Sequence, residues 1–114
     1  MSKKSKQLVR EMSELMECTD RLRTVLLHFK KSIARVSSLM EERDITLAEL
    51  RGTRGPGWRR ELNEALEDFE TLRHQVRVTF LTLAQEQGTS ISEAGRMLGI
   101  SRQLASRVAA EAED

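Results

Sequence analysis

The sequence predicts an all-α protein, in which a long antiparallel helical hairpin, coiled-coil-like, is followed by a C-terminal pair of short helices. Two long segments repeat apolar residues in alternating steps of four and three, which is the spacing of packed helices. A cluster of glycine and proline at residues 51–57 separates them and predicts a loop. The composition agrees, because 32% charged residues with no tyrosine and one tryptophan suit narrow helical stripes rather than a thick core.

The first repeat predicts one helix over residues 5–42, with only Thr19 interrupting the apolar series. The series consists of Leu8, Met12, Leu15, Leu22, Leu26, Phe29, Ile33, Val36 and Met40. Additional apolar residues widen this stripe: Val9, Met16, Val25, Leu27 and Leu39. A wide stripe favours a bundle of three or four helices over a two-stranded coiled coil. Residues 1–7 are basic and polar, and we expect them to be flexible.

The middle of the chain interrupts the repeat. Asp44 is placed to cap one or two helical turns that direct Leu47 and Leu50 inward. After the loop at 51–57 the repeat resumes, predicting a second helix over residues 58–87. Its apolar series consists of Trp58, Leu62, Ala65, Phe69, Leu72, Val76, Thr79 and Leu83. The last turns are apolar on further sides, and the residues expected to support the following helices are Phe80, Leu83 and Ala84.

The C-terminal segment carries the punctuation of two short helices joined by a tight turn. Gly88 is a left-handed stop for the preceding helix, and Ser90 with Glu93 forms a capping box. Gly99 ends the first short helix, and Ser101 caps the next one. Small residues, Ala94 and Gly95, fall where the two helices approach most closely, and the positions that pack helix on helix are apolar: Leu98, Ile100, Ala105 and Val108.

The exposed positions of the second short helix all carry hydrogen-bond donors: Ser101, Arg102, Gln103, Ser106 and Arg107. An arginine guanidinium forks onto guanine, and a glutamine amide pairs with adenine, in the major groove of DNA. The stretch Glu93-Ala-Gly-Arg-Met-Leu-Gly-Ile-Ser-Arg-Gln resembles the bacterial helix-turn-helix family, notably its Fis-type and repressor-type members. The resemblance implies that a helix over residues 101–110 enters the major groove, with Arg102, Gln103, Ser106 and Arg107 facing bases. Within the motif, Gly95 replaces the usual alanine, and Ala105 replaces a larger branched residue.

The hairpin geometry adds a prediction about cations. An antiparallel hairpin returns the start of the first helix to the end of the second, so the N-terminal lysines would flank the helix-turn-helix. We therefore expect contacts with the DNA backbone from Ser90, Ser92, Arg96, Lys3, Lys4 and Lys6. A solubilising role for residues 1–7 remains an equal alternative. The resulting division is a basic N-terminus at 1–7, a hairpin and oligomerisation region at 8–87, and a helix-turn-helix region at 88–114.

Around the loop the sequence leaves two interpretations open. Arginines and a tryptophan surround its glycines: Arg51, Arg54, Arg59, Arg60 and Trp58. They suit contact with a minor groove or phosphate, or alternatively a solvated turn in which Trp58 closes the end of the bundle.

The expected function is sequence-specific binding of double-stranded DNA by a dimeric transcriptional regulator that associates through its long helices. The alternatives are an architectural or segregation factor of low specificity, and a coiled-coil module that binds a protein partner without DNA. No cluster suggests an enzyme, a cofactor or a metal, because His28 and His74 are isolated and the lone Cys18 cannot form an internal disulfide. Without an apolar run of membrane length, we expect a cytoplasmic, nucleoid-associated protein.

Overall fold

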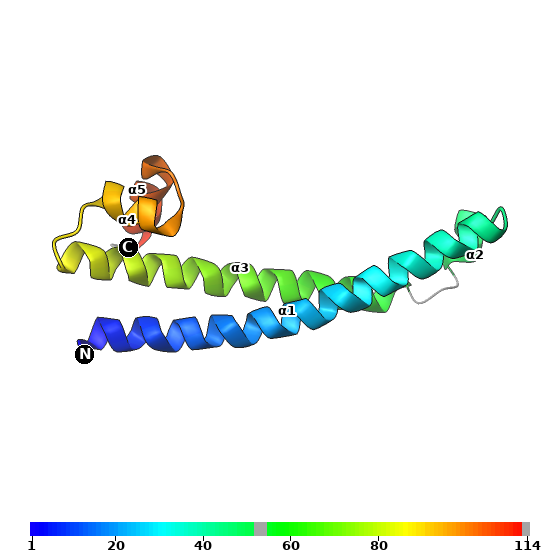
Figure 1. Ribbon diagram of the computed structural model, residues 1–114, viewed down its shortest axis with the longest axis horizontal. Coiled ribbons are helices and arrows are strands. Elements are labelled where there is room, and N and C mark those ends of the chain that lie inside the picture. The colour runs from blue at the N-terminus through cyan, green and yellow to red at the C-terminus, as the bar shows by residue number, and fades with distance from the viewer. Residues whose placement is uncertain (52–54, 113–114) are drawn as a thin grey trace. The chain divides into compact units, whose positions relative to one another are not determined.

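The computed structural model describes residues 1–51 and 55–112, apart from the side chains of residue 50 and residues 55–58. The described residues form helices and no strand, which confirms the all-α prediction and its long first helix (Figure 1). The helices are α1 (Lys3–Glu42), α2 (Leu47–Arg51), α3 (Gly55–Glu86), α4 (Ile91–Leu98) and α5 (Arg102–Glu111). The chain divides into a terminal unit, Met1–Met16 with Glu70–Asp114, and a middle unit, Glu17–Phe69.

The first helix begins earlier than the sequence predicts. The Ser2 hydroxyl accepts a hydrogen bond from the Ser5 backbone N–H at 3.1 Å, which satisfies one of the free donors at a helix start. α1 therefore begins at Lys3, and most of the basic segment expected to be flexible is helical. The signal was present in the sequence, since serine is a preferred N-cap residue.

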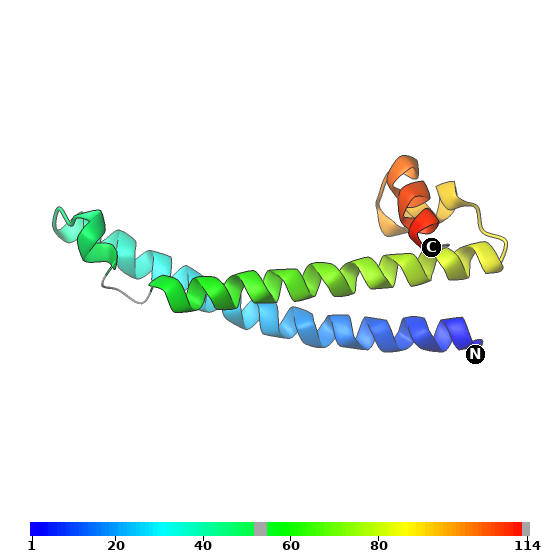
Figure 2. The ribbon, with the colours of Figure 1, turned by 180° about the vertical axis from the view of Figure 1, so that it is seen from behind.

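In the terminal unit, the start of α1 lies antiparallel to the second half of α3 (Figures 1 and 2). Leu8 and Val76 are buried in this unit, and so are the polar residues Glu11 and Thr79. The Thr79 hydroxyl donates to the Glu11 carboxylate, whose second oxygen lies 3.0 Å from it. The Gln7 amide approaches the same hydroxyl at 3.5 Å. A buried carboxylate is thus held by a donor from the facing helix, which fixes how the two helices are aligned.

In the middle unit, α1 and the first half of α3 pack through a small apolar cluster. Leu22 and Val25 of α1 and Ala65 of α3 are its buried members, with Leu62 and Phe69 half-buried against them. On the surface of the same unit, Arg21 Nη1 lies 2.8 Å from Asp68 Oδ2. Both side chains of this pair are about half exposed, so its contribution is small, about 0–1 kcal/mol.

We call the buried side of α1 the seam. In the apolar series predicted to form it, every second position is buried or half-buried as expected. The confirmed positions are Leu8, Leu15, Leu22, Phe29 and Val36. The intervening positions each lie one residue earlier than predicted, and they are Glu11, Cys18, Val25, Ser32 and Leu39. Consequently four residues predicted to pack inside are exposed: Met12, Leu26, Ile33 and Met40. The pattern misled because two seam positions are polar, while the row beside them is more apolar.

The predicted packing row of α3 is confirmed along its described side chains. They are buried or half-buried throughout: Leu62, Ala65, Phe69, Leu72, Val76, Thr79 and Leu83. The start of this helix is not where the sequence placed it, because Gly55, Pro56 and Gly57, expected in the loop, belong to the first turn of α3. Proline is tolerated there, since the backbone N–H groups of a first turn have no partner within the helix. Arg51, also expected in the loop, is the last residue of α2, and residues 52–54 lie outside the described residues.

The short helix α2 also differs from the prediction. Thr46, and not Asp44, caps it, because the Thr46 hydroxyl accepts from the Glu49 N–H at 3.2 Å. Leu47 was expected to point inward, yet its side chain is 81% exposed. The Leu50 side chain lies outside the described residues.

The pairing of Glu11 with Thr79 generates a prediction about stability. Thr79→Val keeps the shape but removes the hydroxyl that donates to this buried carboxylate, so the variant should lose about 1–3 kcal/mol of unfolding free energy. Adding Glu11→Leu removes the charge as well, and the double variant should recover most of the loss. Urea unfolding of the full chain measures both. A Thr79→Val variant as stable as the wild type would show that this hydrogen bond does not hold the helices in alignment.

Candidate nucleic-acid interface

The end of α3 is fixed by the glycine that the sequence analysis identified. Gly88 has φ +82°, in the left-handed region, as predicted. The Gly88 N–H donates to the Gln85 carbonyl at 3.1 Å, and the Thr89 N–H reaches back to the Ala84 carbonyl at 2.8 Å. These two bonds form a Schellman motif, which satisfies carbonyls that would otherwise end the helix unpaired. The chain therefore leaves α3 in a defined direction, and four residues separate the end of α3 at Glu86 from the start of α4 at Ile91.

Helix α4 is capped by Ser90, whose hydroxyl accepts from the Glu93 N–H at 3.1 Å. Of the two hydrogen bonds in the predicted capping box, the bond accepted by the Ser90 hydroxyl is present. No hydrogen bond from the Ser90 N–H to the Glu93 carboxylate forms in the described part of the chain. The acidic side chain nevertheless lies in the first turn, where it favours the positive end of the helix dipole.

The turn between α4 and α5 repeats the arrangement at the end of α3. Gly99 has φ +71°, and its N–H donates to the Arg96 carbonyl, while the Ile100 N–H donates to the Gly95 carbonyl. Ser101 then adopts an extended conformation and accepts from the Leu104 N–H at 3.1 Å, so α5 begins at the next residue. The turn needs only three residues, because Gly99 ends α4 and Ser101 caps the start of α5.

Helices α4 and α5 are in close contact at a glycine. A Cβ atom built on Gly95 would lie 3.1 Å from the Ala105 Cβ and 3.4 Å from the Ile100 carbonyl oxygen. Ala105 is fully buried and Ala94 is 1% exposed. The two departures from the usual motif, a glycine for alanine and an alanine for a larger residue, therefore lie against each other, and together they allow a close contact between the helices.

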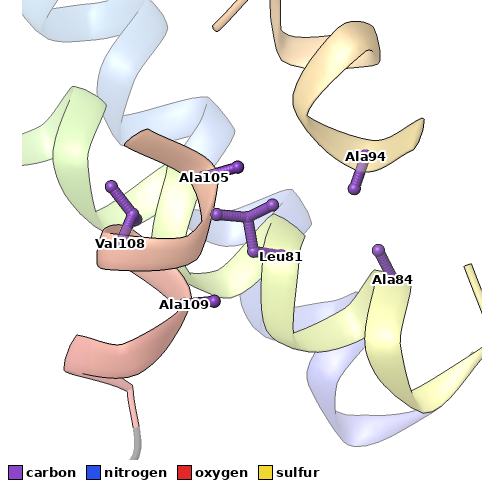
Figure 3. Close-up of a cluster of buried hydrophobic side chains, with 6 residues drawn as sticks. All are labelled: Leu81, Ala84, Ala94, Ala105, Val108 and Ala109. Carbon is purple, nitrogen blue, oxygen red and sulfur yellow. The ribbon is translucent and has the colours of Figure 1, made fainter. Parts of the chain in front are cut away.

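A third helix supports this pair. Figure 3 shows Leu81 of α3 directed between the two short helices, where it is fully buried. The other buried members of the cluster are Ala84 of α3, Ala94 of α4, and Ala105, Val108 and Ala109 of α5. Ala84 and the half-buried Phe80 were predicted in this role. Leu83 was predicted too, but it belongs to the other side of α3, and Leu81 occupies the central position instead. The predicted helix-packing residues Leu98, Ile100, Ala105 and Val108 all belong to this cluster.

The opposite side of α5 is open to solvent. The five predicted base-contacting residues are all exposed: Ser101, Arg102, Gln103, Ser106 and Arg107. Apart from the cap made by Ser101, none of their side chains has a hydrogen bond or ion pair within the described residues. Residues 102 and 106, and residues 103 and 107, are each one helical turn apart, so the donors form two adjacent rows.

The predicted backbone-contacting residues fall into two groups. Ser90 and Arg96 are exposed and Ser92 is half-buried, and all three lie on or beside α4. Lys3, Lys4 and Lys6 belong to the same terminal unit, but α3 lies between their helix and the α4–α5 pair in both views (Figures 1 and 2). The structure thus brings the α4 residues together with α5 and does not bring the lysines there.

The end of α5 is tied to α3 by a contact that the sequence did not suggest. His74 Nε2 lies 2.5 Å from Glu111 Oε2, so the histidine taken as isolated has a carboxylate partner 37 positions away. No group of three or more histidine, cysteine or acidic residues in the described part of the chain is arranged to hold a metal ion. Within the same residues, no helix contains an apolar stretch of the length that a bilayer requires.

Near the loop, Arg51, Arg59 and Arg60 are exposed, while Arg54 and the Trp58 side chain lie outside the described residues.

The sequence matches no model of a known protein family, and neither a curated protein nor a solved structure is significantly similar to the chain.

Because Leu81 is buried between three helices, we expect its truncation to lower the stability of the fold strongly. Leu81→Ala should lower the unfolding free energy by about 2–5 kcal/mol, because it empties the space between α3, α4 and α5. Leu47→Ala is the matched control, since Leu47 is 81% exposed and its truncation should change the stability by about 0.5 kcal/mol or less. Urea unfolding compares the two, and similar losses would contradict the central role of Leu81.

The close approach at Gly95 gives a second prediction. Gly95→Val places two further carbons beyond a Cβ that is already 3.1 Å from Ala105, so the helices must separate, at a cost of about 1–3 kcal/mol. Met97→Val introduces the same side chain into α4 at a position that is 67% exposed and should be nearly neutral. Thermal unfolding monitored by circular dichroism distinguishes them. A stable Gly95→Val variant would mean that the pair tolerates a wider spacing.

Proposed function

We propose that the protein is a sequence-specific, double-stranded-DNA-binding protein, a dimeric transcriptional regulator whose α4–α5 pair acts as a helix-turn-helix. The observation that carries this proposal is the two-sidedness of α5. One side is buried against α3 and α4, while the other presents five donor-bearing residues to solvent. An α-helix fits the major groove, and donors on its outer side are the groups that read base edges there.

The roles of the individual residues follow from their chemistry. Arg102 and Arg107 are assigned to guanine, because a guanidinium donates two parallel hydrogen bonds to its O6 and N7 atoms. Gln103 is assigned to adenine, whose N6 and N7 atoms match a carboxamide. Ser101 and Ser106 complete the base-facing set. Ser90, Ser92 and Arg96 are assigned to phosphates, which position the protein without reading sequence.

The lysines of the first helix are assigned a lesser part than the sequence alone suggested. Lys3, Lys4 and Lys6 remain proposed phosphate contacts, but across α3 from the α4–α5 pair they are unsuited to the groove that α5 enters. Phosphates further along a bound duplex are the chemistry left to them. No catalytic step is assigned to the chain, and no cofactor is needed for binding of this kind.

Two copies are part of the proposal. One recognition helix contacts too few base pairs to select a site, so dimers of such proteins bind two half-sites about one helical turn of DNA apart, or a multiple of it. An architectural or segregation factor of low specificity, and a protein-binding module without DNA contact, are the alternatives. These three functions differ in whether duplex is bound and in whether one sequence is preferred.

Selection of bound duplexes from a random pool by the purified full chain tests the proposal. We expect a motif with two-fold symmetry and a preference over random duplex of roughly a thousandfold or more. Duplex binding without a preferred sequence would favour the architectural alternative. No duplex binding at low salt would exclude both DNA-binding functions.

Variants of α5 connect the selection to particular residues. Arg102→Ala and Arg107→Ala should each weaken binding to the selected site by about 1–3 kcal/mol and relax the base preference at one position. Arg35→Ala is the matched control, because Arg35 is an exposed arginine of α1 in the middle unit and should leave the affinity unchanged. Titrations by fluorescence anisotropy measure the affinities. Unaltered binding by both α5 variants would contradict the assigned orientation of the helix.

A further inference from the structure

The middle unit exposes a regular row of large apolar side chains on α1. Leu26, Ile33 and Met40 are spaced by seven residues, and they are 44%, 48% and 54% exposed. Each follows a seam residue by one position, so the row runs beside the seam along the same helix. Scattered exposed apolar residues need no explanation, but a row at heptad spacing has the form of a second packing surface.

Helix α3 contributes to the same side of the unit. Leu66 is 41% exposed and follows Ala65, which is buried against α1, just as Leu26 follows the buried Val25. In an antiparallel pair of helices, side chains rotated equally from the contact line lie on the same side. Leu66 therefore lies on the side of the row on α1. An open groove of about 550 Å³ is lined on this side by Ile33, Val36 and Met40 of α1 and reaches Arg59 of α3.

We propose that this face, formed by Leu26, Ile33, Met40 and Leu66, binds the same face of a second copy of the chain. The two middle units then form a four-helix bundle. The inference rests on the proposed function for its biological meaning, because that function requires two copies, but its geometry comes from the middle unit alone. It names the surface through which the copies associate.

The heptad spacing of the row supports a second copy as the occupant. A row that repeats every seven residues packs against a helix with the same repeat, and α1 of another copy supplies one of equal length. Arranged antiparallel about Ile33, the two copies place Leu26 of each beside Met40 of the other. Ile33 then meets Ile33 of the second copy on the two-fold axis, as a closed dimer requires.

Charge at the two ends of the row supports the same arrangement. Arg23 lies ten positions before Ile33, and Glu41 lies eight positions after it. In the antiparallel arrangement Arg23 of each copy meets residues 41–44 of the other, which carry three acidic side chains, Glu41, Glu42 and Asp44, and one basic side chain, Arg43. The net charge of that segment is opposite to that of Arg23 at both ends of the interface. A parallel arrangement would instead pair each residue with its own kind. Lys30 lies along the row, where its four-carbon stem can cover apolar surface while the ammonium stays in water.

The experiment is a mass measurement in solution, by sedimentation equilibrium, on the full chain without DNA. The wild type should be a dimer, and Leu26→Glu should raise its dissociation constant by about a hundredfold or more, because two carboxylates enter an apolar interface. Leu27→Glu is the matched control. Leu27 is the same residue type, is similarly exposed at 50%, and is rotated from Leu26 by about 100° around the helix. It should leave the dimer intact.

A charge exchange tests the orientation of the copies and does not depend on the apolar variants. Arg23→Glu should weaken the dimer several-fold, and Arg23→Glu with Glu41→Arg should restore it, because both contacts then reappear with reversed charges. Circular dichroism confirms that each variant keeps its helix content. Ile33→Glu replaces Leu26→Glu if the latter does not fold.

Three outcomes overturn the inference. A monomeric wild type removes the interface, equal weakening by Leu26→Glu and Leu27→Glu removes the assigned face, and a charge exchange without recovery removes the antiparallel arrangement. The proposed function fails separately. A dimer that Leu26→Glu dissociates, but that binds no duplex, supports this interface and rejects the DNA-binding role. Duplex binding by a chain that does not dimerise through this face supports the DNA-binding role and rejects the interface.

Discussion

The arrangement of α4 and α5 depends on the contact between Gly95 and Ala105. Glycine inside a helix costs about 1 kcal/mol relative to alanine, so α4 is intrinsically weakened at this position. The same missing side chain lets α5 approach until Ala105 is fully buried. Once the two helices are this close, α5 has little freedom to rotate. The contact of two small residues therefore decides which side of α5 carries the exposed arginines.

A close pair of short helices cannot bury its own apolar side, and this explains the position of α3. Among the fully buried side chains of the described residues, Leu81 is the large one, and its neighbours in the cluster are alanines and one valine. So small a core leaves few alternative ways to pack. The last turns of α3 therefore fix the orientation of α5, and with it the geometry of the candidate interface.

Local interactions were readable from the sequence, and tertiary choices were not. Gly88, Gly99 and Ser101 act on backbone groups within a few residues, so their residue types alone predicted where helices end and begin. The exposed positions of α5 followed from the same spacing. The seam of α1 did not, because apolar residues occupy adjacent rows and only the facing helix decides which row is buried. Glu11 lies in the buried row despite its charge, because the hydroxyl of Thr79, 68 residues further along the chain on α3, donates a hydrogen bond to it.

The row that the sequence wrongly placed inside is the one that remains exposed, and this has an energetic consequence. Within the middle unit, the cluster between α1 and α3 has Leu22, Val25 and Ala65 as its buried members, which is little for two long helices. Burial of apolar surface contributes about 25 cal/mol per Å², and about half of the surface of Leu26, Ile33 and Met40 is still exposed in the single chain and would add to stability when buried. Association through that row would bring this contribution into the folded state, and the stability of the unit would then increase with protein concentration. In the proposed dimer, the additional apolar residues on α1 would form the part of the four-helix core that faces the second copy.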